Sequence, residues 1–422
     1  MLRFATAGSV DDGKSTLVGR LLHDSKSVLA DTLEAVERAS RDRGSDGMEL
    51  ALLTDGLRAE REQGITIDVA YRYFTTARRK FVLADTPGHV QYTRNMVTGA
   101  STAELVVILI DARKGVVEQT RRHLAVAALL GVRHLVLAVN KMDLVDFEES
   151  VFSAIAADFA AAAEALGVRD HTVIPVSALA GDNVVDASTS MPWYSGPTLL
   201  EHLETVPVGV DASTQPVRFP VQYVIRSADY RGYAGQLASG VLNVGDDVVV
   251  LPSGLRSTVV GIDTFDGSVD LAYAPQSVTV RLADEIDVGR GDLLVRPGDE
   301  PSVVREFDAT VCQLSDRPLQ SGDRVLVKHT TRVVKAIVDQ VNYRLDIETL
   351  DRDGTVNSLG LNEIGGVTLR VAAPLAVDDY NRDRLTGSFL VIDEHDGQTL
   401  AAGLVGDPIA DSSFSTSDGA RL

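Results

Sequence analysis

The chain has almost no cysteine and no long apolar run. Cys312 is the one cysteine among 422 residues, which excludes an internal disulfide framework and is compatible with a reducing cytoplasm. No segment is apolar over the roughly 20 residues that a membrane-spanning helix needs, and the first residues lack the basic region and cleavage site of a secretion signal. We therefore expect a cytoplasmic protein without a membrane partner, in which Cys312 is a small apolar side chain in a strand.

Positive charge is also scarce. The chain has 40 Lys and Arg against 60 Asp and Glu, which gives a net charge of -20. This balance argues against broad attraction to nucleic acid, because such binding depends on clustered Lys and Arg. The dense basic clusters, residues 78–80 and 121–122, are predicted to be a solvated turn and a solvated helix face. We expect no nucleic-acid partner.

One glycine-rich string carries strong chemical information. Residues 8–15 read G-S-V-D-D-G-K-S, a pattern in which backbone N–H groups wrap phosphates and Lys14 reaches the outer two. The apolar run 2–7 predicts a buried strand before the loop, and residues 15–22 predict a helix after it. The order of strand, loop and helix is the one that phosphate binding requires.

A second string predicts a metal site. Asp85 follows the apolar strand 81–84, where its carboxylate would hold Mg²⁺ through a water molecule, while the Ser15 hydroxyl binds the ion directly. Residues 60–68 occupy the place of a second segment that senses the γ-phosphate, and Thr66 is the predicted metal ligand there.

The residues after Asp85 predict a switch. They continue as T-P-G-H, and Gly88 has no side chain to prevent its N–H from approaching a γ-phosphate. His89 follows that hinge, where a neutral imidazole would orient the attacking water.

Two later segments predict the choice of base. Residues 140–143 read N-K-M-D after the apolar strand 135–139. The Asp143 carboxylate would accept hydrogen bonds from the ring N–H and the exocyclic amine of guanine, which adenine does not offer. Lys141 would lie along the base plane, and the tripeptide 177–179 would donate a backbone N–H to the guanine oxygen. With the earlier strings, these segments predict a guanine-nucleotide switch with GTP and Mg²⁺ as cofactors.

The predicted catalytic residues are His89, Lys14 and Thr66, and the predicted metal ligands are Ser15, Thr66 and Asp85. The predicted GTP-binding residues are Gly8, Ser9, Val10, Asp11, Asp12, Gly13, Lys14, Ser15, Thr16, Asp85, Gly88, Asn140, Lys141, Asp143, Ser177, Ala178 and Leu179.

Pattern changes along the chain predict several domains. Residues 1–207 alternate strand-like and helix-like runs, which indicates an α/β P-loop GTPase domain, a mostly parallel sheet with helices on both faces. After a linker, short β-rich runs predict two antiparallel β-barrel domains at 217–300 and 301–405. Residues 406–422 are predicted to be a disordered tail.

A switch domain followed by two barrels resembles the translational elongation factor class of GTPases. Residues 9–16, 54–74 and 91–103 are similar to a narrower family, the GTPase subunit of bacterial sulfate adenylyltransferase. The likeness continues to residues 386–389. Asp12, where elongation factors usually have histidine, is a departure that this narrower family shares.

The resemblance implies a partner and a reaction. In that family a separate small catalytic subunit binds ATP and sulfate and makes adenylyl sulfate and pyrophosphate, while the large subunit couples GTP hydrolysis to that step. We therefore expect a hetero-oligomer, such as a heterodimer, with the small ATP- and sulfate-binding subunit of sulfate adenylyltransferase.

Two alternatives stay open at this point. A translation elongation factor that binds aminoacyl-tRNA would have the same architecture, but the narrower strings do not favour it. A regulatory switch would gate its partner without energetic coupling, and the ratio of GTP turnover to product separates that case from the first.

Overall fold

The computed structural model describes residues 1–26, 34, 36, 38, 40, 50–53, 69–86, 93–209, 212–347, 349 and 351–408. The predicted site residues Thr66, Gly88 and His89 lie outside the described residues, as does the predicted tail from residue 409 onward. The chain forms two compact units, one mainly of Met1–Gly209 and the other of Val210–Asp346 with Asp351–Asp411.

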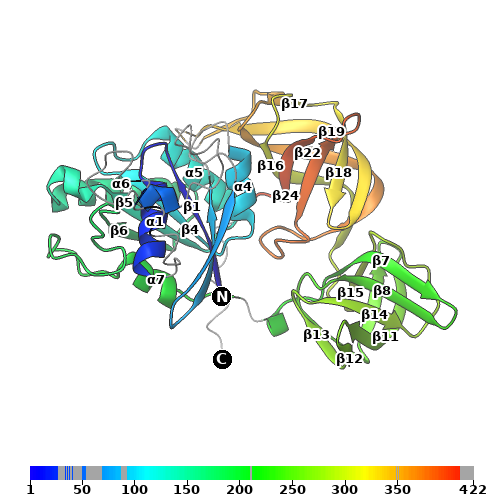
Figure 1. The fold of residues 1–422 in the computed structure, drawn as a ribbon. Helices are drawn as coiled ribbons and strands as arrows, with labels where there is room; N and C mark the ends of the chain where they lie inside the picture. Colours follow the sequence, from blue (N-terminus) through cyan, green and yellow to red (C-terminus); the bar gives the residue numbers. More distant parts are fainter. Residues whose placement is uncertain are drawn as a thin grey trace, which may run out of the picture. The chain divides into compact units, whose positions relative to one another are not determined.

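The first unit is a sheet with helices on both faces (Figure 1). In its described part, six strands pair in the order β2-β3-β1-β4-β5-β6. The β2–β3 pair is antiparallel and the other pairs are parallel. The strands are β1 (Leu2–Gly8), β2 (Ala70–Thr75), β3 (Lys80–Asp85), β4 (Leu105–Asp111), β5 (His134–Asn140) and β6 (His171–Pro175).

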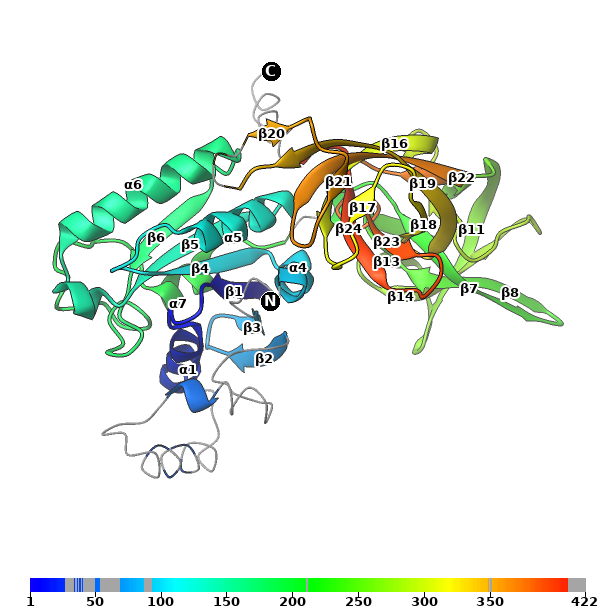
Figure 2. The ribbon, with the colours of Figure 1, turned by 90° about the horizontal axis from the view of Figure 1, so that it is seen from above.

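Helices bury both faces of this sheet. Figure 2 shows α5 and α6 on one face and α1 and α7 on the other. Every residue of β4 is buried, as expected for a central parallel strand covered from both sides. The helices are α1 (Lys14–Asp24), α4 (Thr93–Ser101), α5 (Glu118–Leu129), α6 (Glu149–Ala165) and α7 (Leu199–Thr205), with short 3₁₀ turns at Leu50–Leu53 and Met142–Val145. None of the helices that the structure describes is long and apolar enough to cross a membrane.

The second unit contains two antiparallel barrels. Among its described residues, the first sheet has the order β10-β15-β7-β8-β14-β11-β12 and closes because β10 also pairs with β11. Its strands are β7 (Phe219–Ser227), β8 (Tyr230–Gln236), β10 (Asp247–Leu251), β11 (Leu255–Thr264), β12 (Gly267–Val269), β14 (Ser277–Leu282) and β15 (Leu293–Val295), and a 3₁₀ turn at Ala212–Thr214 precedes them. A small sheet pairs β9 (Val241–Asn243) with β13 (Leu271–Tyr273).

The second barrel has the order β18-β23-β24-β16-β22-β19-β20 and closes through β18 and β19. Its strands are β16 (Ser302–Gln313), β18 (Arg324–His329), β19 (Arg332–Leu345), β20 (Arg352–Asp353), β22 (Ile364–Val377), β23 (Ser388–Asp393) and β24 (Thr399–Val405), and β17 (Leu319–Gln320) pairs separately with β21 (Ser358–Leu359). Cys312 lies buried in β16. The predicted fold class, an α/β GTPase domain followed by two antiparallel barrels, is confirmed.

A buried ion pair joins the two barrels. The Arg218 guanidinium donates from Nε to Asp378 Oδ2 at 2.7 Å and from Nη2 to Asp378 Oδ1 at 2.9 Å. Their side chains are 0% and 1% exposed. Thr386 Oγ1 also donates to Asp378 Oδ2 at 2.6 Å. Burial opposes ionisation of Asp378, but the hydrogen bonds from Arg218 and Thr386 prevail and hold its pKa below the ordinary value.

We expect Arg218→Met to lower the free energy of unfolding of the barrel unit by about 3–5 kcal/mol, because it leaves the Asp378 carboxylate buried without its charge partner. Urea unfolding followed by circular dichroism at pH 7 measures this loss. The matched control is Arg370→Met, which removes exposed ion pairs with Glu306 and Asp339 and should cost less than about 1 kcal/mol. Equal losses in the two variants would contradict the assignment.

In the unaltered protein the contribution of Asp378 to the free energy of unfolding is complete above pH 3.8. It is lost as the pH falls through the depressed pKa of Asp378 in the folded state.

Candidate functional site

The predicted nucleotide-binding residues gather at one edge of the sheet in the first unit. Gly8, Asp85 and Asn140 are the last residues of β1, β3 and β5, and Ser177 comes shortly after β6. The carboxyl ends of parallel strands meet at one edge of a sheet, which is where open α/β sheets bind ligands. The structure therefore brings together strings that lie up to about 170 residues apart in the sequence.

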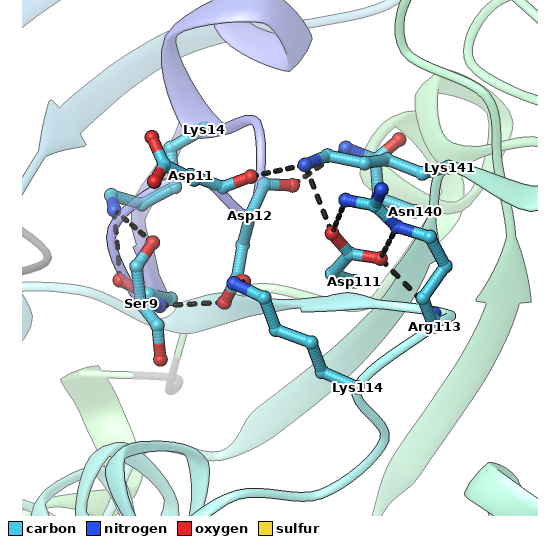
Figure 3. A network of polar contacts seen from close by, with 10 residues as sticks. Ser9, Asp11, Asp12, Lys14, Asp111, Arg113, Lys114, Asn140 and Lys141 are labelled. Carbon is cyan, nitrogen blue, oxygen red and sulfur yellow. Dashed lines mark hydrogen bonds and ion pairs between the residues drawn. The ribbon is translucent and has the colours of Figure 1, made fainter. Parts of the chain in front are cut away.

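The phosphate loop is closed around Lys14. Gly13 has a φ of 94°, and a Cβ at this position would lie 2.4 Å from Asn140 Nδ2, so only glycine fits here. Lys14 Nζ donates to Gly8 O at 2.8 Å and to Ser9 O at 3.3 Å (Figure 3). Burial lowers the Lys14 pKa, while Asp85 and other carboxylates oppose that shift. A cation buried inside a loop that carries backbone N–H donors is suited to an anion.

Asp12 braces the same loop. Its carboxylate is 2% exposed, accepts from Ser9 N at 2.7 Å and lies 3.7 Å from Lys114 Nζ. Burial raises the Asp12 pKa, although the Ser9 hydrogen bond and Lys114 oppose this. Asp12 was predicted from the sequence as a GTP-binding residue, and the structure points its carboxylate at the loop itself.

Asn140 joins the phosphate loop to the predicted base segment. Its Nδ2 donates to Asp12 O at 2.7 Å, and its Oδ1 accepts from Ala178 N at 2.9 Å. Lys141 Nζ donates to Asp11 O on the other side of the loop. Because one side chain fixes both segments, the distance between a bound phosphate and a bound base is set by the fold.

Asp143 is oriented by a neighbour from the base segment. Ser177 Oγ donates to Asp143 Oδ1 at 2.6 Å and accepts from Ala180 N at 3.2 Å. The hydrogen bond from Ser177 fixes one oxygen of the carboxylate. An acceptor of fixed orientation is what recognition of the guanine N–H groups needs.

Asp111 is a site residue that the sequence analysis missed. It ends β4, is 1% exposed and accepts from Arg113 Nη2 at 2.6 Å and from Lys141 Nζ at 3.0 Å (Figure 3). Burial opposes ionisation, but the hydrogen bonds from Arg113 and Lys141 prevail and hold the Asp111 pKa well below its usual range. The sequence signal that could have identified Asp111 is an acidic residue at the end of a fully apolar strand. Its role here is to hold the Lys141 ammonium against the phosphate loop.

Arg20 on α1 was also missed. Its Nε donates to Ala178 O at 3.1 Å, and its Nη2 donates to Leu179 O. Helix α1, which begins in the phosphate loop, thus fixes the base segment through two backbone carbonyls. No local sequence pattern marks such a contact, because its partners lie 158 and 159 residues away.

Asp85 lies next to the phosphate loop. Its carboxylate is 1% exposed and accepts from Thr6 Oγ1 at 2.9 Å. Its charge is felt by the Lys14 ammonium. Ser15 is half-buried at the start of α1, whereas Thr66, Gly88 and His89 lie outside the described residues and stay predictions.

We expect Arg20→Met to release the base segment and to speed dissociation of a fluorescent GDP analogue about 10-fold. Hydrogen bonds from a charged donor contribute about 1.5–3 kcal/mol, and 1.4 kcal/mol corresponds to a tenfold change. Stopped-flow displacement measures the rate. Arg121→Met, which removes a surface ion pair with Asp158, is the matched control and should leave the rate unchanged. A dissociation rate in Arg20→Met equal to that of the control would contradict this role.

Comparison with known proteins agrees with this geometry. The family described as "Elongation factor Tu GTP binding domain" matches residues 1–208, and the family described as "GTP-eEF1A C-terminal domain-like" matches residues 306–406. The first unit is therefore a GTP-binding domain.

Curated relatives match nearly the whole chain. A "Bifunctional enzyme CysN/CysC" of Mycobacterium tuberculosis is 57% identical over 96% of this chain and 67% of its own length. A "Sulfate adenylyltransferase subunit 1" of Bacteroides fragilis is 51% identical over 99% of this chain and 88% of its own length. The protein of the same name in Citrobacter koseri is 52% identical over 97% and 87%. With such identity over almost its whole length, this chain belongs to the sulfate adenylyltransferase subunit 1 family.

Proposed function

We propose that this chain is the GTP-hydrolysing subunit of a sulfate adenylyltransferase. In this assignment GTP hydrolysis drives the synthesis of adenylyl sulfate and pyrophosphate from ATP and sulfate by a separate small subunit. The observation that carries the proposal is the near full-length identity of 51% and 52% to proteins named sulfate adenylyltransferase subunit 1. A name that contains "subunit 1" implies at least one partner, and we propose that this partner is the small subunit that binds ATP and sulfate.

The contacts of Lys14 support GTP binding by the phosphate loop. Its ammonium donates to the carbonyls of Gly8 and Ser9. The outer two phosphates of GTP would compete with these carbonyls for the N–H groups of Lys14. Asn140 and Asp143 would then position the base. The hydroxyl of Ser177 holds the Asp143 carboxylate in place by a hydrogen bond. This arrangement favours guanine, because adenine offers neither the ring N–H nor the exocyclic amine that the half-buried Asp143 carboxylate would accept.

The residues near the phosphate loop fit Mg²⁺. Their donor atoms are oxygens, which Mg²⁺ prefers, and the Asp85 carboxylate is buried beside the loop with one oxygen bonded to Thr6. We assign Ser15 and Thr66 as direct ligands and Asp85 as a ligand through water. When bound, the ion neutralises charge on the β- and γ-phosphate oxygens.

Two further roles rest on the sequence. The Gly88 N–H would contact the γ-phosphate, and His89 would orient the water that attacks it. In the chain, Gly88 and His89 lie between β3, which ends at Asp85, and α4, and Thr66 lies before β2. A change in these segments on loss of the γ-phosphate would report the state of the nucleotide to the partner.

Energetic coupling has a thermodynamic reason. The sulfate–phosphate anhydride of adenylyl sulfate is so high in energy that product hardly accumulates from ATP and sulfate alone. An exergonic reaction linked to its formation shifts that balance. Because the small subunit makes adenylyl sulfate in the proposed reaction, the present chain alone should make none.

The test is GTP hydrolysis by the purified chain, alone and with the small subunit, ATP and sulfate. We expect a large rise that needs all three additions, with GTP turnover in fixed ratio to adenylyl sulfate formed. Lys14→Ala should abolish GTP turnover and the GTP-dependent product but leave the small subunit's own pyrophosphate release, whereas Arg121→Ala should change neither.

Three outcomes would count against the proposal. An unchanged GTPase rate would favour a translation factor or an independent switch. A drifting ratio of GTP turnover to product would favour gating over coupling. Pyrophosphate release from ATP by this chain without a partner would overturn the division of labour.

A further inference from the structure

The barrel unit has a hollow of about 700 Å³ where its two barrels meet. One wall comes from the segment before β15, and the other comes from the β18–β19 hairpin together with part of β22. The polar residues that line it are Arg290, Asp292, Lys328, Thr331, Arg332 and Lys335. We call this feature the basic hollow.

The charge of the basic hollow is opposite to that of the chain. The chain has 60 acidic and 40 basic residues, yet the lining contains two arginines, two lysines and one carboxylate, that of Asp292. Clustered charges of one sign in a concave surface focus the potential and attract counter-ions. The local field therefore favours an anion in a protein whose overall charge repels anions.

Not all of these cations are neutralised by the protein. Arg332 Nη1 lies 3.1 Å from Asp292 Oδ1, and Lys335 Nζ lies 2.5 Å from Glu394 Oε1. The side chains of Arg290 and Lys328 make no hydrogen bond or ion pair with any residue in the described part of the chain. Two cations in the hollow are thus available to a ligand.

Thr331 adds an unused donor. Its Oγ1 is buried and has no hydrogen-bond partner among the described residues. A buried hydroxyl without a partner is costly and rare in native structures, where a water, ion or ligand normally satisfies it. An oxygen atom of an anion in the hollow is the kind of acceptor that this hydroxyl lacks.

The two walls are held in place before any ligand arrives. The Arg332–Asp292 pair crosses from the hairpin of one barrel to the loop of the other, and the buried Arg218–Asp378 pair joins the same barrels. A preformed site loses less entropy on binding than one that must be ordered. Small-molecule sites have volumes of about 300–1,000 Å³, so this hollow has room for a group larger than a single phosphate.

We propose that the basic hollow binds a small polyanion of the phosphate class, free or as part of a nucleotide. Arg290 and Lys328 contact its charged oxygens, and the Thr331 hydroxyl donates to one of them. The apolar part of the lining consists of Val333, Val334, Ala372 and Ala373, and the non-phosphate part of a nucleotide would pack against it. This site is separate in sequence from the phosphate loop and does not depend on the proposed function.

Isothermal titration calorimetry tests the proposal with the full chain loaded with one equivalent of GDP and freed of excess nucleotide, so that the phosphate loop is filled and the hollow is not. Inorganic pyrophosphate is the first probe and ATP is the second. We expect one additional site that weakens as salt is added. The double variant Arg290→Gln/Lys328→Gln should weaken pyrophosphate binding at least 10-fold, and Thr331→Val should weaken it by a smaller factor.

The matched control is Arg256→Gln/Arg324→Gln, which removes the same charge from exposed positions outside the hollow. It should bind pyrophosphate as the unaltered chain does, and all variants should keep the unaltered melting temperature. Equal affinity for pyrophosphate and ATP would show that the phosphate chain alone is recognised. Tighter binding of ATP would show that the apolar residues also contribute.

The proposal is overturned if millimolar pyrophosphate and ATP give no binding to the chain loaded with one equivalent of GDP, or if the control variant weakens binding as much as the double variant. Binding of a polyglutamate peptide without binding of pyrophosphate would instead mark a docking site for an acidic protein segment. None of these results bears on the GTPase measurement, so failure here and failure of the proposed function are distinguishable.

Discussion

The contact between Asn140 and the phosphate loop is the constraint on which the first unit's site depends. The contact is possible because residue 13 is glycine. A Cβ at this position would lie only 2.4 Å from Asn140 Nδ2 and would push the amide away. Through this contact the end of β5 fixes the loop after β1, and through Ala178 N it fixes the segment after β6. A single amide therefore sets the spacing between the phosphate loop and the predicted base segment.

Around this contact, buried charges are paired with one another. Asp12 lies against Lys114, and Asp111 lies between Arg113 and Lys141. Each of these two buried acids thus has a basic partner, as low-dielectric surroundings demand. Lys14 differs from these residues, because its hydrogen bonds go to backbone carbonyls of its own loop and not to a carboxylate. That difference leaves its charge to a ligand.

The sequence predicted the parts of the site that chemistry restricts. Gly13, Lys14, Asp85, Asn140 and Asp143 follow apolar strands in short strings because phosphate, metal and guanine each demand particular groups there. Short β-rich runs with turn residues between them likewise predicted two antiparallel barrels. These features are local, so a linear pattern is enough to find them.

The residues that the sequence analysis missed depend on distant contacts. Arg20 meets the carbonyl of Ala178 across 158 residues, and nothing near either residue indicates the other. Asp111 ends a buried strand, but its pairing with Lys141 across 30 residues follows only from the order of strands in the sheet. Such contacts are set by topology, which a local pattern does not encode.

The sequence separation of Arg218 and Asp378 has a consequence for how the chain is made. The two residues lie 160 positions apart, and a ribosome adds roughly 5–20 residues per second. Arg218 therefore leaves the ribosome on the order of ten seconds before the carboxylate that neutralises it. During that interval Arg218 has no carboxylate partner from the second barrel, so the contact that joins the two barrels is completed only after Asp378 has been synthesised.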